Sequence, residues 1–428
     1  MFSAEVSVKR RSFLQFLAAE AVASPLSQRL ASGAGVNQVG VGVSSDPYGA
    51  TQRAISASGQ FPAATIAGKT VMIKPNLVIK QPATSGATTD PQVVRAVVDL
   101  CLAANAAEII VVEGGVGVGA NFQPCGYDFF SSYDPRVRLM DFGAESVSFV
   151  RVPNGVTYFG LYLPTPAVQP GVVFISVAKL KTHVDTHASL TTKNMFGLAS
   201  PAAYYVPGKL LGRMDGHIRG IDQAAVDVNL ACPISFAVID GIWGMEGNGP
   251  LTGTPINTNV VLAGLNPIAV DRVALDFMQI PQASVPHLAY AYWWGLGPAG
   301  TTSVTVLGDS FTPVPFVRAD VAPTVWRPYA RPNRISASAG GTTTISYTNS
   351  TPCNVNVDII SDPDIKPSVT VIRTLQSYAP TAAGLNTIQW DGRDDNGAQV
   401  PPGIYLARVM STAGQGTGYA TGWIFVSR

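Results

Sequence analysis

Residues 172–198 read VVFISVAKLKTHVDTHASLTTKNMFGL and decide how the chain is interpreted. The stretch opens with an apolar, β-branched run, Val172 to Val177, which predicts a buried strand. Half of the chain's four histidines and three of its lysines follow, in a protein that is only 13% charged: Lys179, Lys181, His183, His187 and Lys193. The chain has few charged residues, and several of them lie directly after one predicted strand. We therefore interpret this segment as the functional site.

The composition limits the kind of protein this can be. With 428 residues, 46% of them hydrophobic, the chain is long enough for one large α/β domain and a smaller second domain. The net charge is +1, from 28 basic and 27 acidic residues, and no long basic tract occurs beyond the extreme N-terminus. Proteins that bind nucleic acid through bulk charge carry a basic stripe, so we expect no nucleic-acid partner.

The four cysteines are far apart in sequence, at Cys101, Cys125, Cys232 and Cys353. No C-x-x-C spacing occurs, which argues against an iron–sulfur cluster and against a four-cysteine zinc site. We expect buried thiols that act as small hydrophobic side chains. If the protein is exported, a disulfide between Cys101 and Cys125 is the alternative.

The N-terminus has the features of an export signal, and we assign residues 1–35 to a signal peptide and linker. Residues 9–15 read KRRSFLQ, and a short apolar segment follows that ends in Ala21-Val22-Ala23. The Arg10-Arg11 pair resembles the twin-arginine signal, which implies the twin-arginine translocase as a partner and a periplasmic, extracellular or cell-surface location. The alternative is a basic amphipathic start to a cytosolic helix. No later run approaches the length of a membrane span, so we expect no transmembrane segment in the mature protein.

Strand-like and helix-like segments alternate from residue 36 to residue 315. We expect strands at 39–43, 70–74, 109–113, 172–177, 236–240, 259–263 and 304–307, weaker strands at 137–140 and 147–150, and helices at 48–58, 91–105, 217–231 and 267–278. This alternation predicts an α/β domain with a mainly parallel sheet and helices on both faces. The glycine-rich loop that follows Glu113 lacks the spacing of a dinucleotide-binding motif, so a Rossmann cofactor is disfavoured.

Polar residues come where the predicted strands end. They are Lys74, Asn76, Glu113, Lys179, Lys181 and Asp240. In open parallel sheets, ligands bind at the carboxyl ends of the strands, so these residues predict a binding site at one edge of the sheet. The competing explanation is that polar loops begin wherever strands end.

Five blocks of sequence, in order, resemble the domain-of-unknown-function family 362 over about residues 38–310. They are VMIKPNLV at 71–78, TTDPQVVRAVVDL at 88–100, VAKLKTHVDTHASLTTKNMFG at 177–197, DGIWGMEGNGPLTG at 240–253 and NPIAVD at 266–271. The resemblance implies an α/β fold but no settled reaction. His217 falls where this family often has a histidine. The ferredoxin-like cysteine clusters of some members are missing here, which argues against direct electron transfer.

The geometry around His183 depends on the local backbone. If residues 178–183 are extended, Lys179, Lys181 and His183 lie on one side of the strand. If the chain turns helical, His183 and His187 lie one turn apart on one face. Either arrangement gathers polar groups into a site.

Three chemistries remain open for this site. An anionic substrate would be bound by Lys74, Asn76, Lys179, Asn194 and the backbone N–H groups of Gly247 and Gly249. A divalent metal such as zinc would be held by His183 and His217 together with Asp240 or Glu246. A lysine with a depressed pKa would act as base or nucleophile, with Lys181, Lys193 and Glu246 as the catalytic candidates.

Structural roles compete with these functional ones. Lys181 and Lys193 could pair with Asp240, Glu246 or Asp271 and only lock the fold. We expect Asp271 to act as a cap or pairing group, and we assign structural or surface roles to His187 and His287. For His183 and His217 both roles stay open.

The residue pattern changes near residue 323, where polar and apolar residues begin to alternate. This pattern predicts short antiparallel strands. Residues 384–409, GLNTIQWDGRDDNGAQVPPGIYLARV, resemble the FlgD-type immunoglobulin-like domain, with Trp390 in the core and a hairpin turn at Asn396-Gly397. We therefore expect a linker at 316–334 and an all-β immunoglobulin-like sandwich at 335–428, with no chemistry of its own. Its acidic residues lack a calcium-loop spacing and are expected to form a solvated turn.

The sequence as a whole favours an exported enzyme of the family 362 type that binds a small anionic substrate, with a divalent metal as an unassigned cofactor. The alternative is a non-catalytic binding protein of the periplasm or cell surface that captures an anion or a metal in the same pocket. Loss of turnover with retained affinity on substitution of Glu246 would separate the two.

Overall fold

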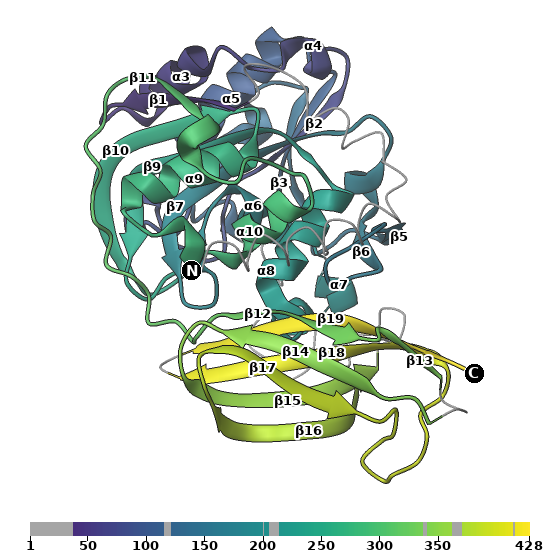
Figure 1. Ribbon diagram of the computed structural model, residues 1–428. Coiled ribbons are helices and arrows are strands. Elements are labelled where there is room, and N and C mark those ends of the chain that lie inside the picture. Colours follow the sequence, from purple (N-terminus) through teal and green to yellow (C-terminus); the bar gives the residue numbers. More distant parts are fainter. Residues whose placement is uncertain are drawn as a thin grey trace.

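The structure is a computed structural model and describes residues 37–114, 121–199, 201–204, 214–336, 340–361, 370–413 and 416–428. Within them, an α/β domain is followed by a β-rich domain that packs beneath it in Figure 1. The predicted signal at 1–35 and most of the glycine-rich loop that follows Glu113 lie outside the described residues. No helix in the described part of the chain is long and apolar enough to cross a membrane.

The main sheet has nine described strands in the order β11-β1-β10-β9-β7-β2-β3-β4, with β8 paired to β7. The strands are β1 (Gln38–Val43), β2 (Thr70–Lys74), β3 (Glu108–Glu113), β4 (Val137–Asp141), β7 (Val173–His183), β8 (His187–Ser189), β9 (Ile234–Glu246), β10 (Thr254–Gly264) and β11 (Thr305–Gly308). Strands β9, β7, β2, β3 and β4 run parallel, whereas β10 is antiparallel to both neighbours. The predicted mainly parallel sheet is confirmed.

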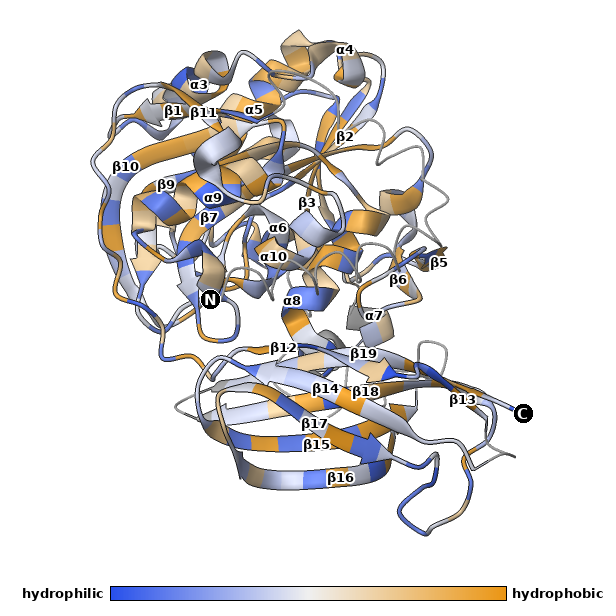
Figure 2. Ribbon diagram, viewed as in Figure 1, coloured by the Kyte–Doolittle hydropathy of each residue, from blue (hydrophilic) through white to orange (hydrophobic). Residues whose placement is uncertain are grey.

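Helices cover both faces of this sheet (Figure 1). One face carries α3 (Pro47–Ser58) and α5 (Pro91–Ala103), and the other carries α8 (Met214–Ala231), α9 (Pro267–Met278) and α10 (Pro286–Trp293). Alternate strand residues enter separate cores: Val71 and Ile73 face one core and Met72 the other. The inner strands β2, β3 and β7 are buried along nearly their whole length, because helices cover both faces of the sheet, and much of the sheet is orange in Figure 2.

Two strands run further than the sequence predicts. Strand β7 continues past Val177 to His183, and β9 continues past Asp240 to Glu246. Both extensions gain antiparallel partners, because β8 pairs with the end of β7 and β10 pairs with β9. The helical alternative for residues 178–187 is therefore wrong, and so is the expectation that the strand predicted at 236–240 ends at Asp240. Lys179, Lys181 and Asp240 consequently lie within strands and not after them.

The remaining elements of the α/β domain are small. They are α4 (Ala63–Ile66), the hairpin of β5 (Val147–Arg151) and β6 (Gly160–Pro164), α6 (Thr191–Asn194) and α7 (Pro201–Tyr204). All four cysteines carry free thiols, and Cys101, Cys125 and Cys232 are buried.

The second domain is a sandwich of two sheets. Their orders are β12-β14-β17 and β13-β19-β18-β15-β16. The strands are β12 (Val325–Arg331), β13 (Arg334–Ser336), β14 (Thr343–Asn349), β15 (Cys353–Ser361), β16 (Thr370–Thr381), β17 (Gly384–Trp390), β18 (Gly403–Ala413) and β19 (Gly416–Ser427). Strand β12 falls in the predicted linker but pairs with β14, so the sandwich begins earlier than expected. The linker prediction is wrong for those residues.

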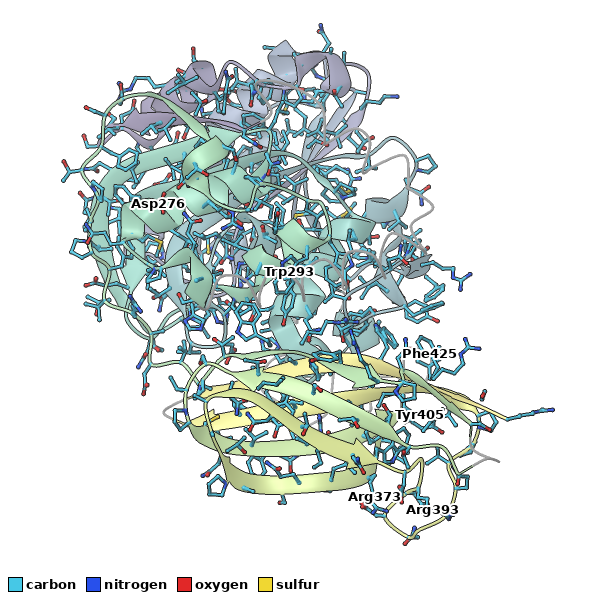
Figure 3. All side chains as sticks on the ribbon, viewed as in Figure 1. Asp276, Trp293, Arg373, Arg393, Tyr405 and Phe425 are labelled. Atoms are coloured by element: carbon cyan, nitrogen blue, oxygen red, sulfur yellow. The ribbon has the colours of Figure 1, made fainter. Side chains whose placement is uncertain are left out.

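The core and the turn of the sandwich match their predicted roles. Trp390 is 1% exposed and packs against Tyr405 with ring centroids 5.6 Å apart. The Asp394 carboxylate accepts backbone N–H groups from Asn396 and Ala398, which holds the turn closed. Arg373 and Arg393, labelled in Figure 3, lie together at this end of the sandwich.

Asp271 has the capping role expected of it. Its buried carboxylate accepts hydrogen bonds from the backbone N–H and the hydroxyl of Thr191 and of Thr192, at 2.5–2.9 Å. These residues begin α6, whose free N–H groups would otherwise be buried without partners. Asp271 thereby fixes α6, which carries Lys193 and Asn194, to helix α9.

Replacing Asp271 by alanine should lower the free energy of unfolding by about 3 kcal/mol or more, because several buried donors lose their acceptor. Asp271→Asn, which keeps one acceptor oxygen, should cost less. Chemical denaturation of the two variants checks this. Equal stability of Asp271→Ala and the wild type would contradict the capping role.

Candidate functional site

The candidate site lies where β2, β3, β7 and β9 approach the short helix α6. Lys74 ends β2, Lys179 and Lys181 lie in β7, and Lys193 lies in α6. None of these four lysine side chains is more than 9% exposed. Lysine is almost never fully buried without a partner, so the partners decide what each ammonium group does.

Two of the lysines are neutralised by carboxylates. The Lys74 ammonium lies 2.5 Å from the Glu113 carboxylate, and the Lys179 ammonium lies 2.8 Å from that of Asp240. Each carboxylate also accepts backbone N–H groups: Glu113 from Gly114 and Leu77, and Asp240 from Asp90 and Ile242. These ion pairs are buried and fully hydrogen-bonded, so they hold the strand ends and the adjoining loops together.

Lys181 has a different environment. Among the described residues, its ammonium donates to three neutral oxygens: the side-chain oxygen of Asn76 at 2.9 Å and the carbonyls of Ala87 and Pro250 at 2.7 and 3.3 Å. Burial, followed by the charges of Lys193 and Lys179, lowers the pKa of Lys181 well below its usual value. Three oxygen acceptors match the three donors of an ammonium group. The surroundings of Lys181 therefore accept hydrogen bonds from the cation but do not neutralise it.

Asn76 and Asn194 link the lysines. The side-chain oxygen of Asn76 accepts a hydrogen bond from the Lys181 ammonium, and its Nδ2 donates to the Asn194 side-chain oxygen at 3.2 Å. Asn194 also lies 3.4 Å from the Lys74 ammonium and donates to the Lys74 carbonyl at 2.9 Å. Four of the predicted residues therefore form one hydrogen-bonded chain: Lys74, Asn76, Lys181 and Asn194.

His183 lies on the same side of β7 as Lys179 and Lys181, as expected for an extended strand. Its Nδ1 accepts the backbone N–H of Asp185 at 3.0 Å, so the proton of the neutral ring is on Nε2. Burial, with a further contribution from Lys193, lowers the pKa of His183 well below its usual value. His183 is therefore a neutral imidazole that can donate a hydrogen bond from Nε2.

Lys193 and His217 share the ring of Phe196. The Lys193 ammonium lies over the ring face, 5.0 Å from its centroid, and the His217 ring meets it edge-on at 5.5 Å. His217 Nε2 is 3.8 Å from the Asp185 carboxylate, and His183 Nδ1 is 4.0 Å from it. Two histidines therefore flank the Asp185 carboxylate, and the Lys193 charge opposes the rise in its pKa that burial causes.

Several predicted residues are engaged elsewhere. The Glu246 carboxylate accepts the Val317 N–H at 2.8 Å, the Gly247 N–H donates to the Val317 carbonyl, and the Gly249 N–H donates to the Gly247 carbonyl. These two N–H groups are not available to an anion in this arrangement. Their hairpin instead closes over Lys181 through the Pro250 carbonyl.

The proposed metal ligands are not assembled either. Asp240 is committed to Lys179 and to backbone N–H groups and does not join His183 and His217. Across the described ranges, no group of three or more His, Cys, Asp or Glu side chains is arranged to hold a metal ion.

The sequence interpretation missed Asp185 and Asp90. Asp185 lies within the lysine–histidine block and could have been found from its place between His183 and His187. Burial and then the Asp240 charge raise the pKa of Asp90 to about 6. Asp90 is the N-cap of α5, and its contact with Asp240 follows from the tertiary fold, which the sequence pattern does not show.

Together these features define an α/β protein with a buried, lysine-rich site, followed by an immunoglobulin-like sandwich. Residues 71–276 match the model of the family Domain of unknown function (DUF362), and residues 333–415 match that of the FlgD Ig-like domain. The chain therefore carries a DUF362 domain and a C-terminal FlgD Ig-like domain.

Individual proteins resemble parts of the chain. The Thylakoid-associated protein sll1697 of Synechocystis sp. is 27% identical over 240 residues, which cover 54% of this chain and 70% of that protein. FlgD of P. aeruginosa is 21% identical with a TM-score of 0.18, over 24% of this chain and 70% of that one. Latent PorU of Porphyromonas gingivalis is 19% identical with a TM-score of 0.19, over 26% of this chain and 10% of that one.

Gly197 tests how tightly the lysine cluster is packed. A Cβ atom at this position would lie 2.4 Å from the Lys74 Cε and 2.7 Å from its Nζ. We expect Gly197→Ala to displace Lys74 from Glu113 and to lower the free energy of unfolding by about 1–3 kcal/mol. Thermal or urea unfolding measures this.

Gly300→Ala is the matched control, because a Cβ there meets only the Gln282 side chain at 4.0 Å. Its stability should change little. If both variants unfold alike, the close approach of Gly197 to Lys74 is not a constraint on the fold.

Proposed function

We propose that the DUF362 domain binds a small anionic substrate at the Lys181–Lys193 end of the site, and that the protein is an enzyme acting on it. The observation that carries this proposal is the environment of Lys181. Among the described residues, its buried ammonium donates to neutral oxygens, and the charges of Lys193 and Lys179 act on it as well. An anion at this end of the site would offset positive charge that is withdrawn from water.

The side chains at this end of the site suit a phosphate or carboxylate ligand. Lys193 supplies a cation, and His183 supplies a neutral N–H donor from Nε2. In a catalytic cycle, such a donor would stabilise negative charge that develops on a substrate oxygen. A second role, that of a binding protein without turnover, uses the same contacts and differs only in whether the anion is transformed.

Lys193→Gln should abolish phosphate binding, measured by calorimetry with inorganic phosphate, while the thermal midpoint changes by only a few degrees. The reason is that glutamine keeps the length and polarity of the side chain but removes the charge. Lys80→Gln, at an exposed lysine, is the control and should bind as the wild type does. Retained binding in Lys193→Gln, or loss of binding only through unfolding, would defeat the proposal.

The same titration run against pH tests Lys181. Its pKa is lowered, so the ammonium loses its proton at a lower pH than an ordinary lysine does. Anion affinity should therefore fall as pH rises, beginning below the usual lysine range, and Lys181→Met should remove this dependence. Affinity that stays constant until ordinary lysines titrate would place the relevant cation outside the buried cluster.

We further propose that the protein is exported through the twin-arginine route to the periplasm or the cell surface. The support is the Arg10-Arg11 pair, the short apolar segment after it and the Ala21-Val22-Ala23 end. Arg10→Lys combined with Arg11→Lys should leave uncleaved precursor in the cytoplasm, as judged by fractionation and mass of the product. Processing at the normal rate in this double variant would point to another route.

A further inference from the structure

Two loops close over the ammonium group of Lys181. The side chain is 0% exposed, and the loops supply the carbonyls of Ala87 and Pro250 that accept its hydrogen bonds. A ligand can reach this ammonium only if one of the two loops moves. The contacts that hold each loop indicate which of them it is.

The loop that carries Ala87 is built into the core of the α/β domain. The buried Thr89 hydroxyl donates to the Val177 carbonyl of β7 at 2.9 Å and accepts the Asn76 N–H at the same distance. The Thr89 carbonyl accepts the hydroxyl of Tyr127, which is also buried, at 2.9 Å. Buried hydrogen bonds open only at a high cost in free energy, so this loop is the fixed wall of the site.

The second loop is the tip of the β9–β10 hairpin, residues 247–253. Its Pro250 carbonyl makes the longest of the three contacts to the Lys181 ammonium, 3.3 Å against 2.7 and 2.9 Å. Glycine occupies three of its seven positions, and the φ of +72° at Gly247 lies in the region that favours glycine. A Cβ atom at Gly247 would meet no other atom within 4 Å, so the backbone has room to turn there.

A strap formed by residues 309–324 leads from β11 to the immunoglobulin-like domain and passes the hairpin tip (Figure 1). The Gly247 N–H donates to the Val317 carbonyl at 2.7 Å, and the Asp320 N–H donates to the Asn248 side-chain oxygen at 2.8 Å. Val317 is 60% exposed, and Asn248 and Asp320 are exposed too. Hydrogen bonds in contact with water open at a low cost in free energy, so these two form a latch that can release.

The strap is fixed on both sides of this latch. Phe316 is 6% exposed, and its N–H donates to the Met278 carbonyl of α9 at 3.0 Å. At the other end, the Pro323 carbonyl accepts the hydroxyl of Ser411, which belongs to β18 of the immunoglobulin-like domain. The position of the strap beside the hairpin tip therefore depends on how the immunoglobulin-like domain is docked.

We propose that the hairpin tip is a lid over Lys181 and that the latch, positioned by the immunoglobulin-like domain, holds this lid closed. The ligand that enters is the anion of the proposed function, on which this part of the inference rests. Opening takes the Pro250 carbonyl away and leaves one Lys181 donor for an anion oxygen, while Asn76 and Ala87 keep the other two. The immunoglobulin-like domain thus regulates access to the site without contacting the anion.

Amine labelling of the full chain measures this opening without any ligand. Acetic anhydride acetylates an amine only when the amine is accessible and unprotonated, and mass spectrometry of the peptides gives the rate at each lysine. Lys181 should react through opening of the lid. Lys179, two residues away in β7 and paired with Asp240, should react only when the protein unfolds. Lys80 is exposed and gives the rate without a barrier.

Asn248→Ala should speed the acetylation of Lys181 by about three- to tenfold, because the latch loses one hydrogen bond. The rates at Lys179 and Lys80 and the thermal midpoint should stay the same. Glu246→Ala removes the acceptor of the Val317 N–H and should act in the same direction.

Asn396→Ala, in an exposed turn of the sandwich, is the matched control and should leave the rates at all three lysines unchanged. The lid is overturned if neither latch variant changes the rate at Lys181. It is also overturned if Lys179 accelerates together with Lys181, because the opening is then unfolding of the strand.

Inorganic phosphate separates the lid from the proposed function. Phosphate at ten times its dissociation constant should slow the acetylation of Lys181 about tenfold and leave Lys80 unchanged. Faster acetylation in Asn248→Ala without any protection by phosphate upholds the lid and removes the proposed function. Phosphate protection with the same acetylation and association rates in Asn248→Ala and the wild type overturns the lid and leaves the anion site in place.

Discussion

Four lysine ammonium groups, from Lys74, Lys179, Lys181 and Lys193, are withdrawn from water at one edge of the main sheet. Removing one such charge from water costs several kcal/mol unless it is paired and hydrogen-bonded, so the surrounding chain must supply acceptors. Glu113 at the end of β3 and Asp240 within β9 neutralise two of the lysines. The need to supply acceptors to these buried ammonium groups determines where the loops run at this edge of the sheet.

The backbone around Lys181 shows how far the requirement reaches. The ammonium donates hydrogen bonds to the carbonyls of Ala87 and Pro250. Ala87 lies in the connection between β2 and α5, and Pro250 lies in the β9–β10 hairpin. These segments must come within one side-chain length of each other. Gly86 allows it, because its φ is +71° and a Cβ there would lie 2.1 Å from the Gly244 carbonyl oxygen. A single buried cation therefore organises two loops that are distant in sequence.

The fold was predictable from the sequence because it depends on local patterns. Apolar runs located the strands, and the helix expected from residue 91 begins there as α5. The ends of β7 and β9 were missed, since their extensions exist only through pairing with β8 and β10, which is a tertiary effect. Alternation along an extended β7 did place Lys179, Lys181 and His183 on one side. What alternation could not provide was the partner of each lysine, because Glu113 and Asp240 come from other strands and Asn76 from the loop after β2.

The position of the immunoglobulin-like domain argues against a role as a simple spacer. A spacer needs no ionisable groups at its junction, yet here Arg327 enters the α/β domain, and burial lowers the pKa of its guanidinium. Helix α8 is also broken at Gly220, where the backbone leaves helical geometry and approaches the Tyr419 carbonyl of β19. His217 and Asp222 flank this break, and both line a pocket of about 40 Å³ between the two domains. The break at Gly220 thus lets β19 approach α8, and it lies between two residues that line the pocket. One local feature of the chain therefore sets both the contact between the domains and the shape of this pocket.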